Sequence, residues 1–244
     1  FQYDSKKSGG VTVSHLRFGK KPIKSQYLVD HADFIALHKS SYIGRYDILE
    51  GIVQGGTFLI NCSWQPEEVF SHLTEDLQRI IREKQVNVYC INASEIAKRV
   101  GLKNKINTIM QAAFFKLSGV LPEDEAITMM KEHIKHQFEH KGMDIVEMNW
   151  SAVDASRDAV AQVPIPHTAE HVQEHHQIPD YAPDFVKNII APIIRRKGDL
   201  IPVSQMTVNG AVPTATTKYE PRGVAEEVPV WIPEHCIQCA QCSF

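Results

Sequence analysis

The sequence lacks several features that would each define a class of protein. No apolar run is long enough to span a bilayer, so we expect no transmembrane helix. The 26 Lys and Arg residues nearly balance the 29 Asp and Glu residues, and no long basic block occurs, which argues against a general nucleic-acid binder. The nucleotide-binding patterns G-x-G-x-x-G and G-x-x-x-x-G-K-[ST] are both missing. We therefore expect no membrane or nucleic-acid partner and no complete nucleotide loop.

Cysteine is scarce, with five in 244 residues. Cys62 and Cys90 stand alone in apolar stretches, and we expect them to be inert thiols of the core. The other three lie close together near the end of the sequence. A secreted domain would pair its cysteines across the fold, so this distribution favours a reducing, cytoplasmic location.

Strand-like and helix-like patterns alternate through residues 1–162. Alternating or apolar β-rich runs predict strands at 11–18, within 27–37, at 57–62 after a break at Gly55-Gly56, and at 86–91. Apolar residues at helical spacing, with Pro, Ser or Gly at the ends, predict helices at 66–83, 94–101 and 104–117, and another from Pro122 onwards. Such alternation implies an α/β fold of three layers, in which helices cover both faces of a mostly parallel sheet.

The composition changes near residue 163, where prolines become frequent. We expect an α/β domain at 1–162, a Pro-rich linker with a short helix near 184–196 at 163–227, and the beginning of another domain at 228–244. The sequence begins without Met and ends just after a cysteine cluster, so we expect it to be a segment of a longer protein.

The cysteines near the end form the pattern Cys236-x-x-Cys239-x-x-Cys242. Three thiols at this spacing let a short loop ligate three irons of a [4Fe–4S] cluster, as in the ferredoxin run C-x₂-C-x₂-C-x₃-C-P. A zinc site with His235 as fourth ligand is the alternative, but zinc motifs usually pair two distant C-x-x-C knuckles. Since a fourth cysteine is missing from this run, we expect the segment alone to hold no stable cluster.

Three further residues are weaker candidates. Lys6 lies in Ser5-Lys6-Lys7-Ser8-Gly9-Gly10, which could meet a phosphate or could be a solvated turn before a strand. Asn107, near the start of a predicted helix, and Asn149, at an expected helix start, could cap helices or contact a ligand.

Four stretches resemble pyruvate:ferredoxin (flavodoxin) oxidoreductase, in the order of that family. They are FQYDSKKSGGVTVSHLRFGKKPI, YDILEGIVQGGTFLINC, KINTIMQAAFFKLSGVLP and VPVWIPEHCIQCAQC. The resemblance covers nearly the whole chain and implies the γ-type domain, the linker after it and the start of a ferredoxin-like domain with two [4Fe–4S] clusters.

The resemblance implies an enzyme that decarboxylates pyruvate on thiamine diphosphate and Mg²⁺, passes electrons through iron–sulfur clusters to ferredoxin or flavodoxin, and forms acetyl-coenzyme A. The thiamine and pyruvate sites would lie in other domains, and the full chain would be a homodimer. By the same resemblance Lys6 would meet a phosphate of coenzyme A, Asn107 and Asn149 would make polar contacts to it, and Cys236, Cys239 and Cys242 would ligate a cluster. The isolated segment would be inactive.

Two other functions stay open. A sister enzyme acting on another 2-oxo acid would share the domain, although such enzymes commonly carry it as a separate subunit, whereas here it continues towards the cysteines. A non-catalytic α/β interaction module with a zinc knuckle would explain the same cysteines without redox chemistry.

Overall fold

The computed structural model describes residues 2–3, 10–166, 178–220 and 229–243. Its main sheet has four strands in the order β3-β4-β5-β6, with bounds Ala32–Leu37, Ile52–Asn61, Asn87–Ile91 and Ala161–Gln162. The first three strands are parallel and β6 is antiparallel to β5. A separate pair, β1 (Gln2–Tyr3) and β2 (Thr12–Val13), is antiparallel. The mostly parallel sheet confirms the expected α/β class.

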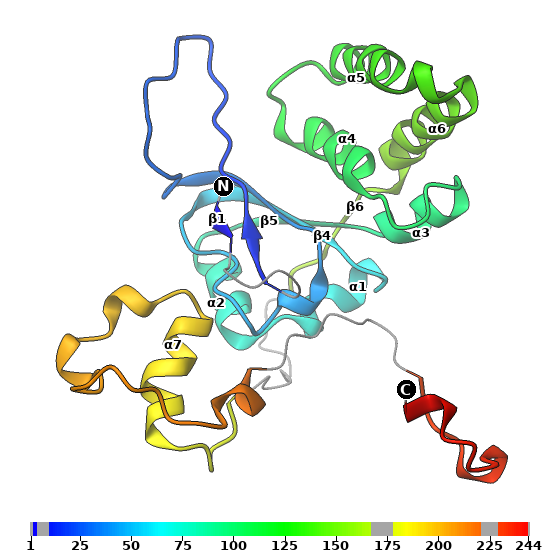
Figure 1. Ribbon diagram of the computed structural model, residues 1–244. Coiled ribbons are helices and arrows are strands. Elements are labelled where there is room, and N and C mark those ends of the chain that lie inside the picture. Colours follow the sequence, from blue (N-terminus) through cyan, green and yellow to red (C-terminus); the bar gives the residue numbers. More distant parts are fainter. Residues whose placement is uncertain (1, 4–9, 167–177, 221–228, 244) are drawn as a thin grey trace.

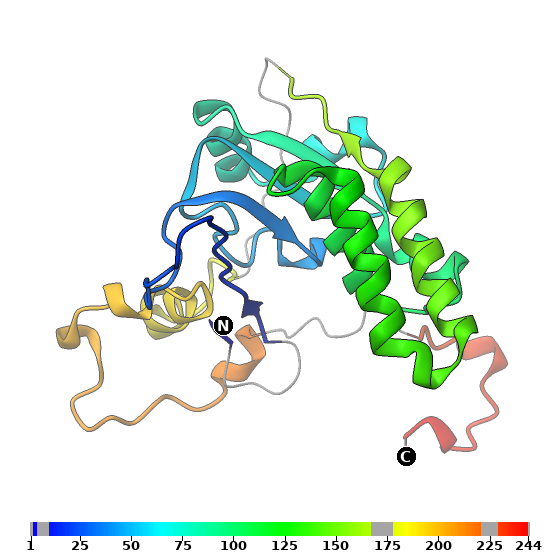
Figure 2. The same cartoon turned by 90° about the horizontal axis from the view of Figure 1, so that it is seen from above.

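Helices cover both faces of the main sheet, as expected for three layers (Figure 1, Figure 2). One face packs against α1 (Pro66–Val69), the short 3₁₀ turn Phe70–His72 and α2 (Glu75–Glu83). The other face packs against α3 (Ala93–Arg99), α4 (Asn107–Ser118) and α6 (Met143–Ala159). Helix α5 (Glu123–Phe138) lies outside α4 and α6 and adds a third apolar cluster with them.

Successive side chains of β4 point to opposite faces of the sheet, so this strand contributes to two apolar cores. Phe58 and Ile60 enter the core under α1 and α2, and Leu59 between them enters the core under α3, α4 and α6. All three side chains are fully buried. A strand buried on both faces reads as a continuous apolar run, which is the pattern that TFLINC shows.

Three predicted elements were wrong in their bounds. Strand β4 continues through Gly55-Gly56, because Gly55 takes a φ of +70° inside the strand and donates its N–H to the carbonyl of Lys84 at 2.7 Å. The single helix expected at 66–83 is divided at Leu73-Thr74, where the Thr74 hydroxyl accepts from the N–H of Leu77 and begins α2. Only Thr12–Val13 of the expected strand 11–18 is paired.

The helix expected near 184–196 is present as a π-helical turn, Val186–Ile190, followed by α7 (Ala191–Ile194). It has its own small apolar cluster, which includes Ala182, Val186, Ile190 and Tyr219. Short 3₁₀ turns lie at Ser40–Tyr42, Glu139–Lys141, Gly198–Leu200, Val203–Gln205, Thr216–Tyr219, Pro233–His235 and Gln241–Ser243. Among the residues described, no helix has the length and apolar character needed to cross a membrane.

Candidate functional site

Asn107 lies where the sequence places it, at the first residue of α4. Its side chain is exposed and makes no hydrogen bond to the residues that the structure describes. The residue before it, Ile106, supplies no side-chain cap. The Asn107 amide is therefore free to donate to or accept from a ligand.

The sequence pattern led us to expect Asn149 at a helix start, and this was wrong: Asn149 lies in the middle of α6. That helix begins earlier because Gly142, with a φ of +115°, turns the chain just before Met143. Asn149 is 6% exposed, and both functional groups of its amide are engaged. Its Oδ1 accepts from the Thr108 hydroxyl at 3.3 Å, and its Nδ2 donates to the carbonyl of Ile145 at 2.8 Å.

One polar contact between α4 and α6 links Asn149 to Thr108, the residue that follows Asn107. Asn107 can touch a ligand directly, whereas Asn149 holds the first turn of α4 in place. Lys6, the third candidate for this site, lies outside the described residues.

A basic loop, defined here as residues 98–105, comprises the last two residues of α3 and most of the connection to α4, and sequence reasoning did not identify it. Four cations lie in residues 98–105, all exposed: Lys98, Arg99, Lys103 and Lys105. A signal was available, because no acidic residue occurs between Glu95 and Glu123. The loop runs directly into Asn107.

Asn61 at the carboxyl end of β4 was also missed. It is 7% exposed, donates to the carbonyl of His38 at 3.0 Å and accepts from the N–H of Ala93 at 2.9 Å. It therefore ties the ends of three neighbouring strands together. A polar residue closing an apolar strand is the sequence signal that could have indicated this role.

The cysteine run is exposed, and all three thiols are free. Two residues between the cysteines, Gln238 and Ala240, take left-handed φ values of +55° and +61°, which are uncommon for residues with a Cβ. Within the described ranges, no group of three or more His, Cys, Asp or Glu residues lies close enough to hold a metal ion. The donor type suits an iron–sulfur cluster, but the described arrangement does not gather the three thiols around a centre.

Cys62, directly after β4, and Cys90, in the neighbouring strand β5, are buried in the same core. Their side chains hydrogen-bond to one another, and this contact together with burial raises the pKa of Cys90 well above its usual range. Neither thiol can serve as a fourth ligand for the distant run without opening the sheet.

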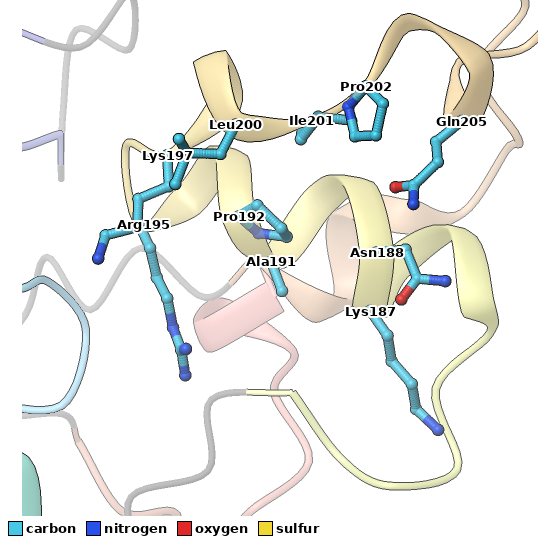
Figure 3. A pocket seen from close by; sticks show the side chains of 10 residues that line it. All are labelled: Lys187, Asn188, Ala191, Pro192, Arg195, Lys197, Leu200, Ile201, Pro202 and Gln205. Carbon is cyan, nitrogen blue, oxygen red and sulfur yellow. The ribbon is translucent and has the colours of Figure 1, made fainter.

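A hollow of about 360 Å³ lies elsewhere, between α7 and the turn after it (Figure 3). Its walls are largely apolar, with the amides of Asn188 and Gln205 at one side. Lys197 at its rim pairs with Asp47. None of the residues singled out from the sequence lines this hollow.

Fold and sequence together describe an α/β domain followed, after a Pro-rich stretch, by a C-x-x-C-x-x-C run. Residues 1–159 match the sequence profile of the pyruvate ferredoxin/flavodoxin oxidoreductase family, and residues 171–225 match a domain of unknown function. The chain belongs to the pyruvate ferredoxin/flavodoxin oxidoreductase family.

The relatives match throughout this chain. It is 50% identical to pyruvate:ferredoxin oxidoreductase of Moorella thermoacetica and 44% identical to pyruvate-flavodoxin oxidoreductase of Enterobacter agglomerans, each over 100% of this chain and 21% of the relative. It is 42% identical to the probable pyruvate-flavodoxin oxidoreductase of Escherichia coli, over 99% of this chain and 21% of the relative. The chain therefore spans about a fifth of the length of these relatives.

One solved structure, a pyruvate oxidoreductase subunit (PORC) from Thermotoga maritima, is 17% identical, with a TM-score of 0.43. The likeness covers 56% of this chain and 67% of that one.

Proposed function

We propose that this chain is part of an enzyme that oxidatively decarboxylates pyruvate to acetyl-coenzyme A and CO₂. An electron pair leaves through [4Fe–4S] clusters to ferredoxin or flavodoxin. The observation that carries this proposal is the identity of 42–50% along the whole chain to relatives with these names. The full-length protein that contains this chain, called the parent below, would be a cytoplasmic homodimer. It would hold thiamine diphosphate and Mg²⁺ outside this segment.

The α/β domain, which we assign to residues 1–162, would contribute coenzyme A contacts. The exposed amide of Asn107 supports a direct contact, since no other hydrogen bond of the described residues occupies it. Asn149 would act through Thr108, whose hydroxyl it holds beside Asn107. Lys6 would meet a phosphate of the same ligand.

Residues 228–244 would supply the first cluster ligands, with 163–227 as the connection. Cys236, Cys239 and Cys242 would each bind one iron as thiolates. The left-handed φ values of Gln238 and Ala240 support a loop that turns sharply between the cysteines, and cluster binding would have to draw the three thiols together. The fourth thiolate must come from elsewhere in the parent, because Cys62 and Cys90 are buried in the sheet.

The test uses the full-length parent purified without oxygen. We expect pyruvate to bleach its visible absorption and coenzyme A to speed reduction of an added carrier. Bleaching by another 2-oxo acid but not by pyruvate would instead identify a sister enzyme. A colourless protein containing zinc would refute the oxidoreductase proposal and leave the interaction module.

A further inference from the structure

The basic loop, residues 98–105, carries four cationic side chains and no acidic residue that could neutralise them. Lys98, Arg99, Lys103 and Lys105 are all exposed, and none of their side chains makes a hydrogen bond or an ion pair with the residues described. Some exposed cations of the chain are paired within the fold: Arg157 binds Glu123 and Asp124, and Arg79 binds Asp76 and Glu83. The loop is therefore a concentrated patch of unneutralised positive charge.

Only two of the four cations lie where they stabilise the fold. Lys98 and Arg99 lie in the last turn of α3, where the helix dipole favours cations. Lys103 and Lys105 precede the first turn of α4, where the dipole disfavours them, and no acid lies in that turn to offset them. The two lysines thus cost stability locally, which indicates a role outside the fold.

The loop holds these lysines on a fixed turn. Leu102 is 8% exposed and buries its side chain in the core, and its N–H donates to the carbonyl of Ala97 at 2.8 Å. The N–H of Lys105 donates to the carbonyl of Leu102 at 3.1 Å. Gly101 and Lys103 turn the chain with φ values of +86° and +59°. The charged side chains therefore project from an anchored segment that ends beside Asn107.

We propose that Lys103 and Lys105, assisted by Lys98 and Arg99, attract and hold the phosphate groups of coenzyme A. This inference rests on the function proposed above and adds residues that the family resemblance did not identify. The loop acts by charge, so its contribution falls as salt screens it. Exposed pairs of this kind are individually weak, so we expect removal of two lysines to weaken binding by about 5-fold or more at low salt.

The experiment uses the full-length parent, with pyruvate-driven reduction of a small artificial dye so that docking of a protein carrier plays no part. Lys103→Gln and Lys105→Gln are made singly and together. Lys135→Gln is the matched control, because Lys135 is an exposed lysine of α5 with no partner among the described residues. We expect the double variant to raise the KM for coenzyme A, with kcat and the KM for pyruvate unchanged, and the control to behave as the parent.

Dephospho-coenzyme A gives a second measurement. The parent should prefer coenzyme A to this analogue, and the double variant should lose part of that preference, as should the parent at high salt. An unchanged KM for coenzyme A in the double variant overturns the inference while leaving the proposed function intact. A change seen only when a protein carrier replaces the dye also overturns it and makes the loop a protein-docking face. If the parent itself shows no dependence on coenzyme A, the proposed function fails first.

Discussion

Replacing Asn149 with Ala separates a structural role from direct ligand contact. The change removes the 2.8 Å bond to the Ile145 carbonyl and the 3.3 Å bond from Thr108, at a site 6% exposed. A hydrogen bond contributes about 1 kcal/mol net, and the truncated side chain leaves a small void. We therefore expect about 2 kcal/mol less free energy of local unfolding for the α4–α6 pair.

Hydrogen exchange of the parent measures this effect. A loss of about 2 kcal/mol corresponds to roughly 30-fold faster exchange of protected amides in residues 143–159, if α6 opens locally. Asn107→Ala is the control: it has no hydrogen bond to lose, so we expect unchanged exchange but a raised KM for coenzyme A. Equal exchange in the Asn149→Ala variant and the parent would refute the structural role that we assign to Asn149.

Three further predictions concern other parts of the chain. Gly51→Ala should destabilise the fold strongly, because Gly51 has a φ of +78° and an added Cβ would lie 2.4 Å from the Asp30 carbonyl oxygen. Gly55→Ala is the control: Gly55 has a φ of +70° but open space around it, so the change should cost only about 1–2 kcal/mol of folding free energy. Equal melting temperatures for the two variants would contradict this prediction. Alkylation of cluster-free protein should label Cys236, Cys239 and Cys242 before Cys62 and Cys90, and mass spectrometry showing early labelling of the buried pair would contradict the described core. His15 has its pKa lowered by burial and by nearby Arg196 and Arg17, and its Nδ1 accepts from the Val29 N–H. Because the pKa of His15 is lower in the folded than in the unfolded protein, His15 stabilises the fold above pH 6.5, and this stabilisation is lost as the pH falls below 6.5. Acid should therefore speed hydrogen exchange near Val29. The same acid effect in the His15→Gln variant would contradict this prediction.

Much of the fold follows from local pattern. Strand β5 and helix α5 lie where the apolar spacing, Pro122 and Gly119 place them, and Gly119 ends α4 with a φ of +62°. The continuous apolar run of β4 also predicts a strand buried on both faces. These features depend on residues that are close in the sequence, so the sequence pattern alone predicts them.

The errors came from hydrogen bonds that the spacing of apolar residues does not reveal. The break at Leu73-Thr74 is stabilised by the buried amide of Gln78, which donates to the carbonyls of Phe70 and Leu73. The sequence Thr74-Glu75-Asp76 was a helix-start signal that the apolar spacing outweighed. Strand β4 passes through its glycines because Lys84 holds the backbone from another element.

The candidate site was only partly predictable. Asn107 could be found from its place at a helix start, but the bond from Thr108 to Asn149 joins residues 41 apart in sequence. The basic loop was visible as a long stretch without acids, yet its relation to Asn107 depends on how Leu102 anchors the turn. Sequence pattern located the residue types, and packing decided which of them could meet a ligand.

The proposed contact of this chain with coenzyme A lies at the start of α4. Hydrogen exchange of the full-length parent with and without coenzyme A tests it most directly. We predict slower exchange in residues 103–110, and none of this protection when pantetheine, which lacks the nucleotide phosphates, replaces coenzyme A. Protection by coenzyme A confined to other parts of the parent, with residues 103–110 unchanged, would contradict the account.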